Sequence, residues 1–118
     1  MSIRLLVLDI DETLVETVVK PLSRVPDLRF KEYAVYRRPH LTEFLEYCFG
    51  NFDVGIWSSA RKRYVTFISE TIFALKYDLK FVWSEEYCDQ PTSGESSIKD
   101  LRRLRVLGYV SEEIVGRQ

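Results

Sequence analysis

The stretch LLVLDIDETLVE, residues 5–16, places an acidic pair directly after an apolar run, and this combination constrains the fold more than any other feature. Residues 3–8 are almost continuously apolar, which predicts a strand buried on both faces, as in a parallel sheet covered by helices. Ligands of such sheets bind beyond the carboxyl ends of the strands. Asp9 and Asp11 fall at such an end.

The spacing of Asp9 and Asp11 predicts a shared site. Just past a strand end the backbone stays nearly extended, so residues i and i+2 point the same way. Both carboxylates are ionised near neutral pH, and two like charges need a cation or a shared proton. Mg²⁺, a hard cation with oxygen ligands, meets that need. A simple Asx turn after the strand is the alternative without a metal.

The segment after this pair predicts a loop or hairpin and then a helix. Residues 17–36 are mixed and contain two prolines, which argues against one long element. The helix is expected to carry Pro39 in its first turn, with His40 beside it as a structural residue, and to stop at Gly50 and Asn51. Its apolar stripe at i, i+3, i+4 and i+7 consists of Leu41, Phe44, Leu45 and Cys48.

A second strand, helix and third strand follow. Residues 52–57 and 79–84 are short apolar runs that predict strands. Between them lies a helix for which Ser58 or Ser59 is the expected cap. Its apolar stripe consists of Tyr64, Phe67, Ile68, Thr71, Ile72 and Leu75. The alternation of strands and helices predicts an α/β fold with a parallel sheet.

The last third of the chain is less regular. Residues 88–97 are turn-rich, and Leu101, Leu104 and Leu107 are spaced to line one side of a helix. Ile114 and Val115 resemble the start of another strand. The 118 residues suit one domain, 1–118.

Composition excludes several classes of function. A net charge of −1 gives no basic field for nucleic acid, and no apolar run approaches the roughly 18 residues that a membrane span requires. Two cysteines are too few for a disulfide scaffold, so both are interpreted as reduced thiols. The expectation is an intracellular protein, cytoplasmic or nuclear.

Three segments together resemble a known family. LLVLDIDETL is similar to the first motif, hhhhDxDxTL, of the haloacid dehalogenase (HAD) superfamily of aspartyl-phosphate hydrolases. Residues 36–65, YRRPHLTEFLEYCFGNFDVGIWSSARKRYV, resemble a block of one HAD branch, and IKDL at 98–101 matches its lysine motif. That branch holds the NLI-interacting-factor-like phosphatases, including those acting on the C-terminal domain of RNA polymerase II. The resemblance covers most of the chain and implies a Rossmann-like HAD core.

The resemblance implies a role for five residues. Asp9 would be the nucleophile, and with the Asp11 backbone carbonyl it would bind Mg²⁺. Asp11 would protonate the leaving oxygen and then deprotonate the attacking water. Thr13 would buttress the loop, Ser58 would bind a phosphoryl oxygen, and Lys99 would neutralise charge on Asp9 and the phosphoryl group. The implied substrate is a phosphorylated protein, at phosphoserine or phosphothreonine, or a small phosphate ester.

The chain departs from the family pattern after Lys99. The family's fourth motif places one or two aspartates after another apolar strand, whereas the only downstream acids here are Asp100, Glu112 and Glu113. We therefore expect the sequence to stop before the C-terminal part of the HAD core and metal binding to be weakened. The competing hypothesis is a non-catalytic HAD-like binding module, similar to the phosphatase-like domain of a mitochondrial inner-membrane translocase subunit.

Basic and aromatic residues carry weaker expectations. The basic positions are solvated charges or recognise a phosphopeptide: Arg37, Arg38, Arg61, Lys62, Arg63, Arg102, Arg103 and Arg105. The aromatics of the second strand and helix are interpreted as core residues: Trp57, Tyr64, Phe67 and Phe73.

Overall fold

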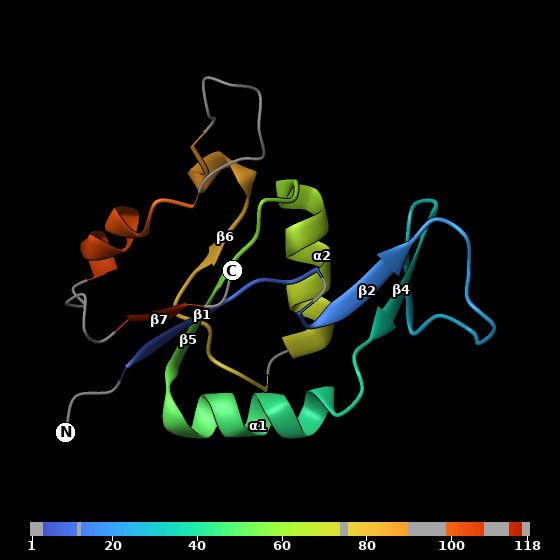
Figure 1. The fold of residues 1–118 in the computed structure, drawn as a ribbon, viewed down its shortest axis with the longest axis horizontal. Coiled ribbons are helices and arrows are strands. Elements are labelled where there is room, and N and C mark those ends of the chain that lie inside the picture. The colour runs from blue at the N-terminus through green and yellow to red at the C-terminus, as the bar shows by residue number, and fades with distance from the viewer. Residues whose placement is uncertain (1–3, 12, 74–75, 90–98, 108–113, 117–118) are drawn as a thin grey trace.

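A four-stranded parallel sheet forms the centre of the molecule (Figure 1). The computed structural model describes residues 4–11, 13–73, 76–89, 99–107 and 114–116. The sheet has the order β6-β5-β1-β7, and every neighbouring pair is parallel. Its strands are β1 (Leu5–Leu8), β5 (Asp53–Trp57), β6 (Val82–Trp83) and β7 (Ile114–Gly116). The prediction of an α/β fold with a parallel sheet is therefore confirmed, and β7 begins at the predicted Ile114.

A second, antiparallel sheet lies beside the first and occupies the segment for which the sequence indicated only a loop or hairpin. It has the order β2-β4-β3, with β2 at Val15–Val18, β3 at Leu28–Phe30 and β4 at Tyr33–Arg37. The β3–β4 turn contains Lys31 in a left-handed conformation, with φ of 53°. These strands are short and partly exposed, so their apolar pattern was too weak to predict a sheet.

Helix α1 spans Leu41–Asn51, later than predicted at its start. His40 has a left-handed backbone, with φ of 61°, so neither it nor Pro39 belongs to the first turn. The helix passes through Gly50 and ends where Phe52 becomes extended. Leu41, Leu45 and Cys48 are buried as expected, whereas Phe44 is exposed.

Helix α2 spans Lys62–Phe73, so Ser58 and Ser59 lie outside it and the predicted cap is wrong. The chain between β5 and α2 is held by other bonds: the Ala60 carbonyl accepts the N–H of Glu85. Thr71 is exposed and donates to the Phe67 carbonyl, contrary to the predicted apolar stripe. Leu75 lies outside the described residues. The buried positions of α2 are Val65, Ile68, Ser69, Ile72 and Phe73.

Two short 3₁₀ helices complete the fold, η1 at Glu85–Tyr87 and η2 at Leu101–Leu107. A 3₁₀ helix has three residues per turn, so Leu104 and Leu107 face the same way, as their spacing predicted. Most of the predicted turn-rich segment, 90–97, lies outside the described residues. Within the described part of the chain, no helix is long and apolar enough to cross a membrane.

The two faces of the parallel sheet pack against different elements. Leu8 and Ile56 join the side chains of α1 and α2 in one apolar cluster. Leu5, Val7 and Trp57 point the other way, into a cluster with Leu104 of η2. Alternate residues of β1 thus enter opposite faces, as expected for a strand covered on both sides. The antiparallel sheet projects beyond α2, while η2 lies at the other end of the view (Figure 1).

Candidate active site

A tight turn follows β1 and carries the acidic pair. The buried Ile10 directs its carbonyl to the N–H groups of Thr13, Leu14 and Val15, at 3.3, 2.8 and 3.2 Å. Its own N–H donates to Asp9 Oδ1 at 2.8 Å. The turn therefore holds Asp9 and Asp11 on either side of an anchored apolar residue. The amide of the partly buried Thr13 is one of the groups that closes it.

Asp9 is paired with a cation supplied by the protein. Lys99 Nζ lies 3.3 Å from Asp9 Oδ2, and the two side chains are only 17% and 26% exposed. At these exposures solvent screens the pair incompletely, so the ammonium offsets much of the repulsion that the sequence predicted. This contact joins residues 90 positions apart, and no local sequence pattern contains it.

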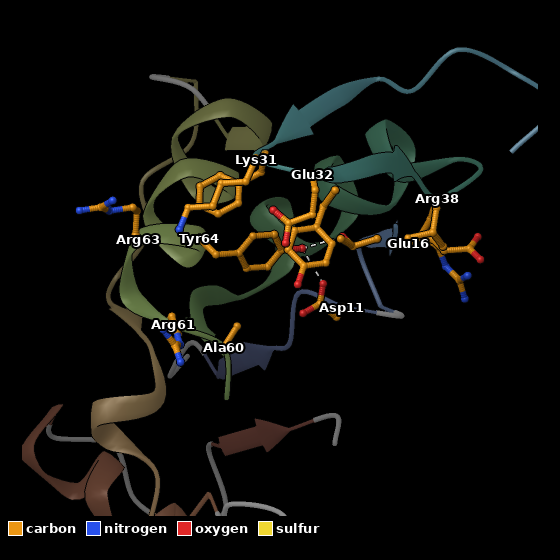
Figure 2. Close-up of a pocket in the computed structure, with 13 residues that line it drawn as sticks. Asp11, Glu16, Lys31, Glu32, Arg38, Ala60, Arg61, Arg63 and Tyr64 are labelled. Atoms are coloured by element: carbon orange, nitrogen blue, oxygen red, sulfur yellow. Dashed lines mark hydrogen bonds between the residues drawn. The ribbon is translucent and has the colours of Figure 1, made fainter. Parts of the chain in front are cut away.

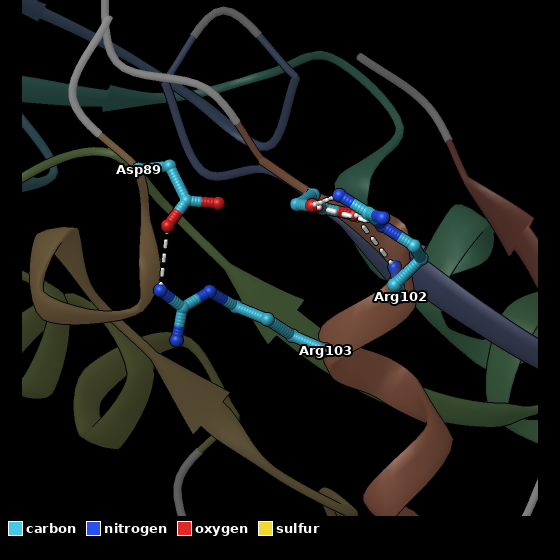
Figure 3. Close-up of polar contacts among 4 residues, drawn as sticks. Asp89, Arg102 and Arg103 are labelled. Carbon is cyan, nitrogen blue, oxygen red and sulfur yellow. Dashed lines mark hydrogen bonds and ion pairs between the residues drawn. The ribbon is translucent and has the colours of Figure 1, made fainter.

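The start of η2 is fixed next to Lys99. The Asp100 carboxylate accepts a hydrogen bond from the Arg102 backbone N–H at 3.0 Å. It also accepts bidentate hydrogen bonds from the Arg102 guanidinium, at 2.7–3.1 Å. These hydrogen bonds lower the pKa of Asp100 to about 2. Arg103 reaches across to Asp89 at 2.6 Å (Figure 3). Both arginines thus have acidic partners in the fold, which favours the structural interpretation of these basic residues.

Asp11 has a different neighbour, a tyrosine. Tyr64 donates its hydroxyl proton to Asp11 Oδ1 at 2.6 Å and lies 2.7 Å from Thr17 Oγ1 (Figure 2). Burial, together with the hydrogen bond to Asp11, raises the pKa of Tyr64 well above its ordinary value. The charge of Asp9 contributes in the same direction, so both carboxylates lie within electrostatic reach of this hydroxyl.

Ser58 follows β5, the strand beside β1. It is 1% exposed, and its backbone N–H donates to the Trp83 carbonyl at 2.9 Å. Its Oγ accepts the Ala60 N–H at 3.0 Å, an arrangement in which the hydroxyl proton can still be donated. Leu8 and Ile56 are register partners, so the carboxyl ends of β1 and β5, with Asp9 and Ser58, meet at one edge.

Of the predicted site residues, Asp9 and Lys99 are in direct side-chain contact, and the others are placed around the same edge of the sheet. Asp9 touches Lys99, Asp11 touches Tyr64, and Ser58 ends the neighbouring strand. Sequence analysis missed Tyr64 and Thr17, and Tyr64 was assigned to the core. Its place in the first turn of the helix that follows β5 is the signal that it lies near the same edge of the sheet.

A cavity of about 1020 Å³ opens beside Asp11, between the antiparallel sheet and the start of α2 (Figure 2). Basic side chains border it from both elements, and Phe30, Tyr33 and Tyr64 provide aromatic surface. The basic residues are Lys31, Arg38, Arg61 and Arg63. Three of these were predicted as candidates for phosphopeptide recognition. Acids also line it, at Asp11, Glu16 and Glu32, so the cavity is mixed in charge.

The donor set has the chemistry of a magnesium site without forming a closed cage. In the described part of the chain, no three His, Cys, Asp or Glu side chains gather closely enough to hold a metal ion together. Mg²⁺ commonly takes one or two protein carboxylates and completes its shell with water and substrate phosphate. Asp9 and the backbone carbonyl of Asp11 fit that pattern.

Comparison with known proteins gives consistent results. Residues 4–115 match the family described as NLI interacting factor-like phosphatase. CTD phosphatase-like proteins of Invertebrate iridescent virus 6 and Invertebrate iridescent virus 3 are 41% and 39% identical over 60% and 55% of this chain. These matches cover 45% and 41% of the viral proteins, so the chain spans less than half the length of its curated relatives.

Solved structures show the same fold. An arginine-to-alanine variant of the fission yeast RNA polymerase II CTD phosphatase Fcp1, bound to beryllium fluoride, matches with a TM-score of 0.68 at 20% identity. A second Fcp1 structure matches with a TM-score of 0.65 at 18% identity. Each match covers 97% of this chain and 36% of the other. The described sheets and helices thus share the α/β fold of these proteins.

Proposed function

The chain belongs to the NLI interacting factor-like phosphatases, and on that premise we propose that it hydrolyses phosphate monoesters through an aspartyl-phosphate on Asp9. The observation that carries this proposal is the ion pair of Lys99 with Asp9, 3.3 Å apart, at the carboxyl end of β1. Phosphoryl transfer depends chiefly on positioning and on stabilising charge. The Lys99 ammonium beside Asp9, with the buried Ser58 hydroxyl after the neighbouring strand, would supply both.

In the first step a carboxylate oxygen of Asp9 forms a bond to phosphorus while the bond from phosphorus to the leaving oxygen breaks. Protonated Asp11 gives its proton to that oxygen, so the product leaves as an alcohol. Lys99 and the Ser58 hydroxyl stabilise the charge on the phosphoryl oxygens. Thr13 keeps the turn closed, which maintains the separation of the two aspartates.

In the second step the acyl-phosphate is hydrolysed. Asp11, now ionised, takes a proton from water as the water oxygen bonds to phosphorus. The bond between phosphorus and Asp9 breaks, which releases inorganic phosphate and restores the Asp9 carboxylate. Asp11 ends the cycle protonated, as it began. Asp9 and the Asp11 carbonyl would hold Mg²⁺, which when bound adds positive charge beside the phosphoryl oxygens.

The cavity beside Asp11 supports a phosphorylated protein segment as substrate. Its volume of about 1020 Å³ exceeds the needs of a phosphate group alone, and its aromatic and basic walls suit a peptide with a phosphoserine or phosphothreonine. A small phosphate ester is the second candidate.

The described cysteines, Cys48 and Cys88, are free thiols, which supports a reducing compartment such as the cytoplasm or nucleus.

The test compares the chain with Asp9→Asn and with Asp78→Asn, which alters an exposed carboxylate remote from the site. We expect Mg²⁺-dependent release of phosphate from a phosphoserine peptide by the wild type and Asp78→Asn, and none by Asp9→Asn. ¹⁹F NMR with beryllium fluoride should show a bound signal that disappears only in Asp9→Asn. Undiminished turnover by Asp9→Asn would contradict the proposal. Peptide binding without turnover would favour the non-catalytic binding module instead.

A further inference from the structure

We propose that Tyr64 is a positioning residue for the proposed phosphatase reaction: together with Thr17 it holds the Asp11 carboxylate in the orientation needed for proton transfer. The inference rests on the proposed function, because it concerns the residue assigned as acid and base. It starts from a short side-chain hydrogen bond, 2.6 Å from the Tyr64 hydroxyl to Asp11 Oδ1.

The direction of each hydrogen bond follows from the number of protons. A phenol carries a single O–H, which Tyr64 donates to Asp11 Oδ1, and this oxygen can accept it whether Asp11 is ionised or carries its proton on Oδ2. The contact of 2.7 Å between Thr17 and Tyr64 must then be donated by the threonine hydroxyl. The result is a one-directional chain, from Thr17 to Tyr64 to Asp11, that ends on one carboxylate oxygen. Pinning that oxygen also fixes the direction of the second.

The tyrosine is itself restrained. Its ring packs edge-on against Phe30 of β3, with centroids 5.4 Å apart, and Phe30 also contacts Phe67 of α2. Because the ring is held by aromatic contacts as well as by hydrogen bonds, its hydroxyl cannot swing away without disturbing the packing between α2 and the antiparallel sheet. This rigidity is what a group that orients a catalytic acid requires.

The arrangement gives the antiparallel sheet a part in the chemistry. Thr17 lies on β2, Tyr64 on α2 and Asp11 after β1, so three separate elements meet at one carboxylate. All three residues border the cavity assigned to the substrate (Figure 2). The second sheet therefore both forms a wall of that cavity and sets the orientation of the acid inside it.

A positioned acid matters most when the leaving group is poor. An alkyl oxygen, as in phosphoserine, needs a proton as its bond to phosphorus breaks, whereas an activated nitrophenolate leaves without one. Loss of the Tyr64 hydroxyl should therefore lower kcat/KM, which reports the steps up to release of the leaving group, far more for an alkyl phosphate than for an aryl phosphate. Hydrolysis of the acyl-phosphate is common to both substrates, so kcat alone does not isolate this step. A merely structural role would lower both values of kcat/KM by the same factor.

The experiment measures kcat and KM of the full chain for a phosphoserine peptide and for p-nitrophenyl phosphate. The variants are Tyr64→Phe and Thr17→Val, with Tyr47→Phe as the control because Tyr47 is 62% exposed on α1. We expect Tyr64→Phe to lower kcat/KM for the peptide by about 10- to 100-fold, with kcat/KM for the aryl phosphate little changed. Thr17→Val should show the same selectivity to a smaller degree, and Tyr47→Phe no effect.

Equal losses of kcat/KM on both substrates would overturn the positioning role and leave the phosphatase proposal standing. If the wild-type chain hydrolyses neither substrate, the proposed function and this inference fall together. Thermal unfolding of each variant is measured in parallel, and the aromatic contacts with Phe30 are retained in Tyr64→Phe. A selective loss at unchanged melting temperature supports the inference.

Discussion

At the scale of single residues, the protein relieves the charge repulsion between its two aspartates in two different ways. Asp9 forms an ion pair with the Lys99 ammonium and accepts a hydrogen bond from the Ile10 N–H. Asp11 accepts a hydrogen bond from the Tyr64 hydroxyl. The two aspartates thus have different neighbours, a cation for Asp9 and a phenol for Asp11.

The ion pair leads to a prediction about Lys99. Lys99→Met keeps the length of the side chain and removes its charge, so charge on Asp9 and on the transferring phosphoryl group loses a stabilising partner. We expect kcat to fall by about 10²- to 10³-fold, as for the loss of other preorganised electrostatic groups. Steady-state phosphate release measures the change. Lys80→Met, which alters an exposed lysine paired with Asp78, is the matched control and should retain wild-type rates. Wild-type kcat in Lys99→Met would exclude this role.

At the scale of elements, β5 depends on a glycine at its centre. A Cβ placed on Gly55 would overlap the ring of Phe81, a buried residue packed against Trp83. The missing side chain lets that ring lie directly on the strand. Gly50 presents the opposite case, because a Cβ there meets no atom within 4 Å and the residue lies in α1.

The two glycines predict changes of opposite sign. Gly55→Ala should destabilise the fold by about 1–3 kcal/mol, since the crowded ring must leave its position. Gly50→Ala should stabilise it by up to about 1 kcal/mol, because alanine favours the helix. Urea denaturation followed by circular dichroism gives both values. Equal effects of the two substitutions would show that packing against Phe81 does not determine the choice at residue 55.

At the scale of the whole molecule, the parallel sheet is covered by helices on one face and by η2 on the other. Leu104 is fully buried in the cluster with Leu5, Val7 and Trp57. The same 3₁₀ helix follows Lys99 directly, so the packing that closes this face of the sheet also brings the lysine to Asp9. The 3₁₀ helix η2 therefore contributes both to the stability of the fold and to the position of Lys99.

Leu104→Ala tests this connection. Removing a fully buried leucine side chain should lower the free energy of unfolding by about 2–5 kcal/mol, through lost burial and a residual cavity. Leu22→Ala, at a leucine that is 45% exposed, should cost much less. Chemical denaturation of both variants measures the difference. A cost for Leu104→Ala no greater than that for Leu22→Ala would show that η2 does not close the core.

Local patterns predicted the elements better than their ends. The runs at β1 and β5 were visible because buried parallel strands are continuously apolar. The start of α1 was misplaced because His40 adopts a left-handed backbone conformation, which cannot be predicted from the presence of a histidine. The caps proposed at Ser58 and Ser59 failed because the chain from β5 to α2 is held by bonds to η1 and β6. The sequence indicated a loop or hairpin in the segment of the antiparallel sheet, and β3 and β4 form such a hairpin. The β2 strand was missed because its partner, β4, lies further along the chain.

The sequence by itself determined the alternation of strands and helices, the acidic turn after β1 and the family to which the chain belongs, because these are written in neighbouring residues. Only the tertiary structure decided which groups meet. Lys99 reaches Asp9 across 90 positions, and Tyr64 and Thr17 reach Asp11 from α2 and β2. Such contacts follow from the packing of whole elements against one another, and that packing depends on interactions summed over the entire core.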